Sequence, residues 1–166
     1  KRVAHICHIL AEGYGLSKHD ADLVRLASPL HDVGKVGIPD AILNKPAKLE
    51  PQEWEVMKTH TDKGYTILKD SPHEIVSTGA IIAKEHHEKW DGSGYPQGLS
   101  GNAINVFGRI VALADVYDAL RHKRCYKEPW TLQNVVDEIN AEKGTHFEPK
   151  MVEVFNEKLD ELEAVL

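Results

Sequence analysis

The chain has 166 residues, of which 42% are hydrophobic and 28% are charged, and its formal net charge is −6 at pH 7. This length and composition fit one globular domain, and the absence of any run of roughly 20 apolar residues excludes a membrane span. The acidic balance also argues against a general surface for DNA or another polyanion, because such surfaces are strongly basic.

Apolar residues recur at helical spacing along the whole chain, and no alternating pattern indicates a sheet. We therefore predict an all-α domain, a single bundle of about seven helices. The first helix is expected over residues 1–12, ending at Gly13, and the second from the cap Ser17 to near Gly34. Residues 34–51 are predicted to form a loop with at most a short turn around residues 41–43. Because the periodicity begins at the first residue, we expect the domain to come from a longer protein.

The later helices are predicted in the same way. A helix that starts near Pro51 places Trp54, Met57 and His60 on one side, so His60 is expected to face inward. A helix over residues 75–86 is followed by a glycine- and proline-rich segment, 90–98, which is expected to be an ordered loop or a lid. Residues 107–120 are apolar almost all round, which indicates a central helix. Two more helices are expected, one over residues 131–144 and one from Pro149 onward.

Asp115 lies in the middle of the predicted central helix, among valine, alanine and leucine residues. A carboxylate is costly to bury there without a cation or strong hydrogen-bond donors. A salt bridge to Arg109 or Arg121 is the alternative to a metal ion.

Two adjacent pairs, His31-Asp32 and His86-His87, stand where predicted helices end. Neighbouring residues on a regular helix project about 100° apart, so both members of a pair can face one centre only at a helix end. For either pair alone, surface or core histidines would be the simpler interpretation. Together with His60 and Asp115, the pairs predict a site for two divalent cations. Nitrogen and oxygen donors without cysteine favour iron, manganese, zinc, nickel or magnesium, and a two-metal site suits phosphoester hydrolysis.

Other residues near these ligands suit a phosphorylated substrate. Lys35 follows Asp32 by three residues and could offset charge on a phosphate, although a solvated loop lysine is the alternative. Arg124 and Lys127 belong to a short basic cluster past the Asp115 helix, where phosphate contact competes with a plain solvated surface. Tyr95 offers a ring for a purine, unless it only anchors its loop.

Several segments resemble the HD-GYP family of the HD phosphohydrolase superfamily. Residues 31–39 (HDVGKVGIP) resemble its HD signature, and residues 86–99 (HHEKWDGSGYPQGL) resemble the defining GYP segment. Residues 115–120 with 124–127, and residues 144–149 (GTHFEP), resemble the segments that follow. The likeness covers nearly the whole chain, 1–166.

The resemblance implies a cytoplasmic bacterial signalling enzyme that hydrolyses cyclic di-GMP to linear pGpG, and often on to GMP, through a metal-bridging hydroxide; related cyclic dinucleotides are also implied as substrates. It implies metal ligation by six residues, with Asp32 bridging two metals: His31, Asp32, His60, His86, His87 and Asp115. It assigns phosphate contacts to Lys35, Arg124 and Lys127, with Lys35 catalytic beside Asp32, and guanine-side contacts to Gly94 and Tyr95. An upstream sensor or receiver domain is also implied.

The chain departs from the family pattern at two places. The family has another histidine ligand, and sometimes a glutamate for a third metal, at positions that would precede Lys1, so the activity of this chain without them is open. Arg121, His122, Lys123 and Cys125 replace residues that are usually small or proline.

Two alternatives remain: a weakly active module that binds diguanylate-cyclase (GGDEF) domains through the GYP loop, and hydrolysis of another nucleotide. Cys7 and Cys125 lack a CxxC spacing, which favours a reducing, cytoplasmic setting.

Overall fold

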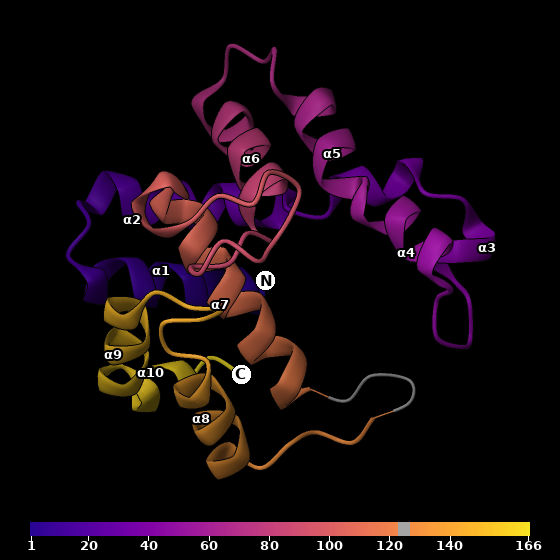
Figure 1. The fold of residues 1–166 in the computed structure, drawn as a ribbon. Helices are drawn as coiled ribbons and strands as arrows, with labels where there is room; N and C mark the ends of the chain where they lie inside the picture. Colours follow the sequence, from indigo (N-terminus) through magenta and orange to yellow (C-terminus); the bar gives the residue numbers. More distant parts are fainter. Residues whose placement is uncertain (123–126) are drawn as a thin grey trace.

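The protein is all-α, as the sequence predicts (Figure 1). The computed structural model describes residues 1–122 and 127–166, and an isolated β-bridge joins Lys143 and Phe147. The helices in chain order are α1 (Arg2–Tyr14), α2 (Lys18–Ala27), η1 (Ser28–Leu30), η2 (Val33–Gly37), α3 (Asp40–Leu43), α4 (Pro51–Lys58), α5 (His60–Leu68), α6 (Glu74–Glu85), η3 (Gly101–Ala103), α7 (Val106–Arg121), α8 (Leu132–Ala141), α9 (Pro149–Glu157) and α10 (Leu159–Glu163).

The helices α1 and α2 form an antiparallel pair whose turn is set by local chemistry. Gly15 ends α1 in the left-handed conformation (φ 97°), a conformation that glycine adopts without a steric penalty. The helix therefore ends at Tyr14, one residue past Gly13, where the sequence pattern predicted its end. The Ser17 side chain accepts a hydrogen bond from the Asp20 N–H and caps α2, as predicted.

The helix α7 occupies the centre of the bundle and packs against α1, α6, α8 and α9 (Figure 1). Five consecutive residues, 110–114, are buried and so cover every side of the helix, which explains why its sequence is apolar almost all round. The Tyr117 ring meets Phe155 of α9 edge to face, with 5.3 Å between centroids. Packing in this core sets the position of α7 and therefore that of Asp115.

Three predicted helices are shorter or divided in the structure. The second, predicted from Ser17 to near Gly34, ends as an α-helix at Ala27 and continues only as the 3-10 helix η1. The helix expected from Pro51 breaks at Thr59 into α4 and α5, and the last helix breaks at Lys158 into α9 and α10. The inward orientation predicted for His60 is confirmed, since 2% of this residue is exposed. The predicted loop contains α3, as expected, and also the 3-10 helix η2.

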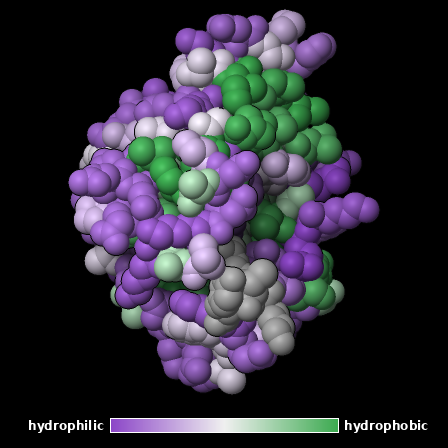
Figure 2. Space-filling model, turned by 90° about the vertical axis from the view of Figure 1, so that its right-hand side faces the viewer, coloured by the Kyte–Doolittle hydropathy of each residue, from purple (hydrophilic) through white to green (hydrophobic). Residues whose placement is uncertain are grey.

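The surface carries some apolar side chains outside the core. Figure 2 shows hydrophobic residues gathered over part of the face that lies to the right in Figure 1, among mainly hydrophilic ones. On η2 and α5, Val36 and Ile67 are 80% and 54% exposed. Among the helices of the described ranges, none combines the length and hydrophobicity that crossing a membrane requires.

Candidate metal centre

Both adjacent pairs lie at helix ends, as the sequence predicts. His31 follows the last residue of η1, and Asp32 directly precedes η2. His86 is the C-cap of α6, and His87 begins the loop after it. The backbone changes direction at each pair, so neighbouring side chains reach one region instead of diverging around a helix.

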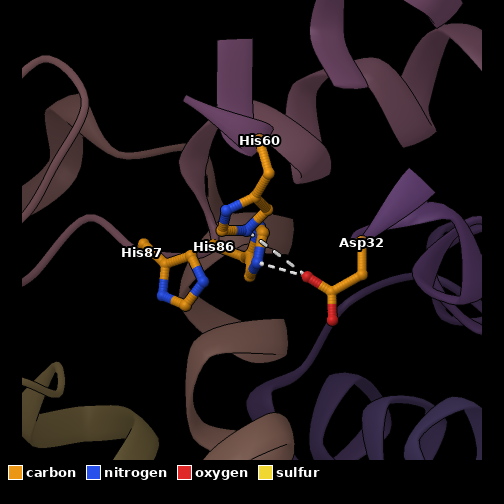
Figure 3. Close-up of side chains that lie close together, drawn as sticks. All are labelled: Asp32, His60, His86 and His87. Carbon is orange, nitrogen blue, oxygen red and sulfur yellow. Dashed lines mark ion pairs between the residues drawn. The ribbon is translucent and has the colours of Figure 1, made fainter. Parts of the chain in front are cut away.

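Three histidines, His60, His86 and His87, cluster with Asp32 (Figure 3). The Nε2 atoms of His60 and His86 each lie 3.4 Å from Asp32 Oδ1. With His87 included, one ligand atom from each of the four residues lies within 4.8 Å of all the others. This cluster comes from the residue before η2, the start of α5 and the end of α6, and it has the donor types and spacing of a cation site.

Backbone carbonyls orient three of the imidazole rings. His31 Nδ1 lies 2.7 Å from the Ser28 carbonyl oxygen, and His60 Nδ1 lies 2.7 Å from that of Met57. His86 Nδ1 lies 3.0 Å from the carbonyl oxygen of Ile82. Because a carbonyl only accepts hydrogen bonds, each Nδ1 donates, and this turns each Nε2 toward the centre.

The other oxygen of Asp32 faces a second group of side chains. His31 Nε2 lies 3.3 Å from Asp32 Oδ2 and 3.6 Å from Asp115 Oδ1. The Lys35 ammonium donates to the same Oδ2 at 3.0 Å. The Asp32 carboxylate therefore stands between two clusters, which is the placement that a bridging ligand requires.

The alternative salt bridges for Asp115 do not occur. Arg109 donates to Glu148 at 2.8 Å, and Arg121 pairs with Glu163 at 2.6 Å. The Asp115 side chain is 31% exposed, so it is less deeply buried than its apolar neighbours in sequence suggested. It lines the edge of the centre and faces His31.

Electrostatics keeps most of these groups in their metal-binding forms. Burial lowers the pKa of His86, and burial together with the neighbouring imidazoles of His86 and His60 lowers that of His87 to about 2. Burial opposes ionisation of Asp32, but the adjacent imidazoles of His31, His60 and His86 outweigh it and lower the carboxyl pKa. Burial also disfavours charge on His31, yet hydrogen bonds with Asp115 and Asp32 raise its pKa to about 10. A divalent cation would replace that proton as the partner of the two carboxylates.

The residues present fit a metal ion. Within residues 1–122 and 127–166, three buried atoms at the centre have no hydrogen-bond partner: Asp32 Oδ1, His60 Nε2 and His86 Nε2. Buried polar atoms without partners are costly, and these three converge on one point. A cation bound there would satisfy all of them at once.

The loop after the second histidine pair packs directly on the centre. The Tyr95 ring stacks on His87, with 4.9 Å between centroids and an 18° interplanar angle, and meets Trp54 edge to face. A Cβ atom on Gly94 would lie 2.4 Å from the His87 carbonyl oxygen, so only glycine allows this close approach. The placement supports a positioning role for Tyr95 beside the base contact that the sequence predicts.

Glu88 is a structural residue of the site that sequence reasoning missed. Its carboxylate is buried and accepts hydrogen bonds from the backbone N–H groups of Gln97 at 2.7 Å and Leu99 at 3.0 Å. It therefore ties the far end of the loop to the segment that carries His87. Its position next to two histidines in a loop rich in glycine was the available signal, since such a loop needs acceptors for its N–H groups.

Of the three predicted phosphate contacts, the structure describes two, Lys35 and Lys127. Lys35 lies at the centre through its ion pair with Asp32, and Lys127 is exposed. Arg124, with Lys123 and Cys125, lies outside the described residues. Cys7 is buried as a free thiol.

Comparisons with known proteins show the family to which this chain belongs. The family model described as HD domain matches residues 1–151. A 3′3′-cGAMP-specific phosphodiesterase 2 from Vibrio cholerae is 53% identical over 99% of this chain and 32% of its own length. The cyclic di-GMP phosphodiesterase response regulator RpfG from Xanthomonas campestris pv. campestris is 44% identical over 99% of this chain and 44% of its own. A cyclic di-GMP phosphodiesterase from Thermotoga maritima is 46% identical over 93% and 42%, respectively.

Two solved structures share the fold. A cyclic GMP-AMP specific phosphodiesterase from V. cholerae superposes with a TM-score of 0.70 at 21% identity, over 99% of this chain and 47% of that one. An HDGYP protein from Bdellovibrio bacteriovorus superposes with a TM-score of 0.71 at 19% identity, over 95% and 50%. The chain thus spans less than half the length of the curated relatives named above.

Proposed function

This chain belongs to the HD domain family and carries the HD-GYP signature segments, and from that premise we propose that it is a metal-dependent phosphodiesterase that hydrolyses cyclic di-GMP to linear pGpG. The observation that carries the proposal is the convergence of buried, unpartnered ligand atoms from His60 and His86 on Asp32. Further cleavage of pGpG to GMP at the same centre, and a cytoplasmic location, belong to the same proposal.

Six side chains would hold two divalent cations, iron, manganese or a similar metal. His60, His86 and His87 would serve one, His31 and Asp115 the other, and Asp32 both. Such ions supply Lewis acidity toward a phosphoryl oxygen and lower the pKa of bound water. Support for this division comes from the two oxygens of Asp32, which face different groups of ligands. A third ion would require ligands from outside this sequence.

The protein's own cations would hold the scissile phosphate. The Lys35 ammonium already lies at the edge of the centre, 3.0 Å from Asp32 Oδ2, so a phosphate oxygen bound there would lie within its reach. Arg124 and Lys127 are proposed to complete the phosphate contact. Lys35 contacts the proposed ligand Asp32 but is not itself a ligand. We therefore expect its substitution to affect turnover more than metal binding.

The loop residues Gly94 and Tyr95 are proposed to contact the guanine side of the substrate. Gly94 brings the backbone against the segment of His87, and the Tyr95 ring already forms part of the wall of the centre. Relatives are named for cyclic di-GMP and for 3′3′-cGAMP, so the mixed dinucleotide is the competing substrate. GGDEF-domain partners and an upstream regulatory domain are proposals that rest on the family resemblance.

Elemental analysis combined with a turnover assay tests the function. The purified chain is loaded with Mn²⁺ or Fe²⁺ and assayed on cyclic di-GMP, beside Asp32→Ala and Lys35→Gln variants. We expect Asp32→Ala to lose both metal and turnover, and Lys35→Gln to keep the metal but to lose roughly 100-fold in kcat. Full activity without metal would refute the mechanism. A metal-loaded chain that leaves cyclic di-GMP intact but binds a GGDEF domain would favour the scaffolding alternative.

A further inference from the structure

A hollow of about 180 Å³ opens beside the metal centre, between the α4–α5 junction and the glycine-rich loop. Its lining residues are Glu55, Lys58, Thr59, Asp62, Tyr95 and Pro96. One wall is the Tyr95 ring, which stacks on the predicted ligand His87, and Thr59 directly precedes His60. The Tyr95 ring therefore separates the hollow from the predicted ligand His87.

The lining offers an unpaired carboxylate and a cation above an aromatic ring. Within residues 1–122 and 127–166, the exposed Asp62 carboxylate has neither an ion pair nor a hydrogen bond. The Lys58 ammonium lies 5.7 Å from the centroid of the Tyr95 ring and pairs with Glu55 at 2.7 Å. A flat base edge with both donors and an acceptor matches these groups better than a phosphate, which the carboxylates would repel.

Guanine has this combination of groups. Its N1–H and N2–H₂ groups donate to a carboxylate, and its O6 accepts from an ammonium. Adenine presents an unprotonated N1 on the same edge, which a carboxylate repels. Exposed bases are commonly bound in this manner, by an aromatic surface and by hydrogen bonds to the Watson–Crick edge.

We propose that this hollow is a guanine-binding subsite, in which Asp62 accepts from N1–H and N2–H₂, Lys58 donates to O6, and Tyr95 forms the wall. The proposal rests on the proposed function, because it assigns one base of the cyclic dinucleotide substrate to this hollow. It adds a determinant of base specificity on α4 and α5, outside the signature segments.

Occupation of the hollow by guanine has a consequence for a mixed dinucleotide. Hydrolysis adds one water across a P–O3′ bond, leaving a 5′-phosphate on one nucleotide and a 3′-hydroxyl on the other. Either of the two phosphodiester bonds of 3′3′-cGAMP can be cleaved, which gives 5′-pGpA or 5′-pApG. If guanine alone fits the hollow, the same bond always lies at the metals, and one linear isomer predominates.

The first measurement uses binding and needs no turnover. GMP and AMP are titrated into the metal-loaded chain by calorimetry, with Asp62→Asn as the test variant. Asp70→Asn is the matched control, because Asp70 is exposed and does not line the hollow. We expect GMP to bind about tenfold more tightly than AMP, and Asp62→Asn to abolish the difference. Equal affinity of the wild-type chain for both nucleotides would overturn the subsite.

The second measurement follows the products of 3′3′-cGAMP hydrolysis by chromatography. We expect the wild-type chain to give one linear isomer in about tenfold excess, and Asp62→Asn to give a mixture nearer to equal amounts. For cyclic di-GMP, the same variant should raise KM about tenfold with kcat within about twofold, while Asp70→Asn changes neither. A product ratio that Asp62→Asn leaves unchanged would refute the assignment. A wild-type chain that hydrolyses no cyclic dinucleotide would instead refute the proposed function, and the nucleotide titration would still decide the subsite.

Discussion

The Gly34→Ala substitution tests whether the packing of η2 on α5 builds the metal centre. A Cβ atom at Gly34 would lie 1.9 Å from the His60 carbonyl oxygen and 2.5 Å from the Gly64 backbone nitrogen. Ordinary contact begins near 3.4 Å, so the two elements must separate by about 1.5 Å. That shift moves His60 away from Asp32, and misplacement of this size in a site costs about 100-fold in rate. We expect metal affinity to fall about 10- to 100-fold and the free energy of unfolding to fall by at least about 1–3 kcal/mol.

A matched control lies three residues away in the same helix. A Cβ atom on Gly37 would meet only the side chain of Lys63, at 2.7 Å from Cδ, and that flexible chain can move aside. Gly37→Ala should therefore keep metal affinity within about twofold of the wild-type value. Mn²⁺ titration by calorimetry and thermal unfolding give both quantities for each variant. If Gly34→Ala binds Mn²⁺ as tightly as Gly37→Ala does, close packing at this glycine is not what positions the ligands.

Three further measurements test other parts of the structure. Mn²⁺ at 100 times its dissociation constant should raise the free energy of unfolding of the wild-type chain by about 2.7 kcal/mol. Asp32→Ala should remove most of this gain. Equal stabilisation of the wild-type chain and the variant would contradict the ligand assignment. Glu88→Gln places an N–H₂ group against a backbone N–H that needs an acceptor. It should lower the free energy of unfolding by about 1–3 kcal/mol and speed hydrogen exchange at the Leu99 amide. Unchanged exchange would show that the Glu88 carboxylate does not hold the loop. Burial, with the nearby charge of Lys89, lowers the pKa of His146 from 6.5 to about 4. As the pH falls, His146 therefore takes up a proton in the unfolded chain before it does so in the folded chain. The free energy of unfolding should keep its full value above pH 6.5 and fall by up to about 3 kcal/mol as the pH drops toward 4. His146→Asn should flatten that part of the curve in urea titrations, and an unaltered curve would rule out this residue as the cause.

Periodicity predicted the helical class and the capping residues but missed the breaks within long helices. Ser17 and Thr131 cap α2 and α8 as their residue types predict. The break at Thr59 has no glycine or proline to announce it. It arises where α5 docks on η2 through Gly34 and Gly64, an interaction between segments that local spacing does not encode.

The convergence of the site was predictable because its ligands come in adjacent pairs at helix ends. Neighbours such as His31 and Asp32 can share a centre only at a helix end, and the glycines that follow each pair predicted such an end. The role of Glu88 was not predictable in this way. The glycine-rich loop indicates that an acceptor for its N–H groups is needed, but only the folded loop shows that Gln97 and Leu99 are the donors to this carboxylate.

The position of Asp32 also explains why this centre needs so few acidic ligands. Its two oxygens face two groups of side chains, so one carboxylate offers charge to both proposed cations. The break between η1 and η2 makes this possible, because it frees the carboxylate from the face of a helix. The carbonyls that orient His31 and His60 belong to residues three positions earlier in the chain, at Ser28 and Met57. Ring orientation is thus set by the local turns, whereas the distance between the two groups is set by packing at Gly34. A substitution in a turn should therefore affect one ligand, and a substitution at Gly34 should affect the whole centre.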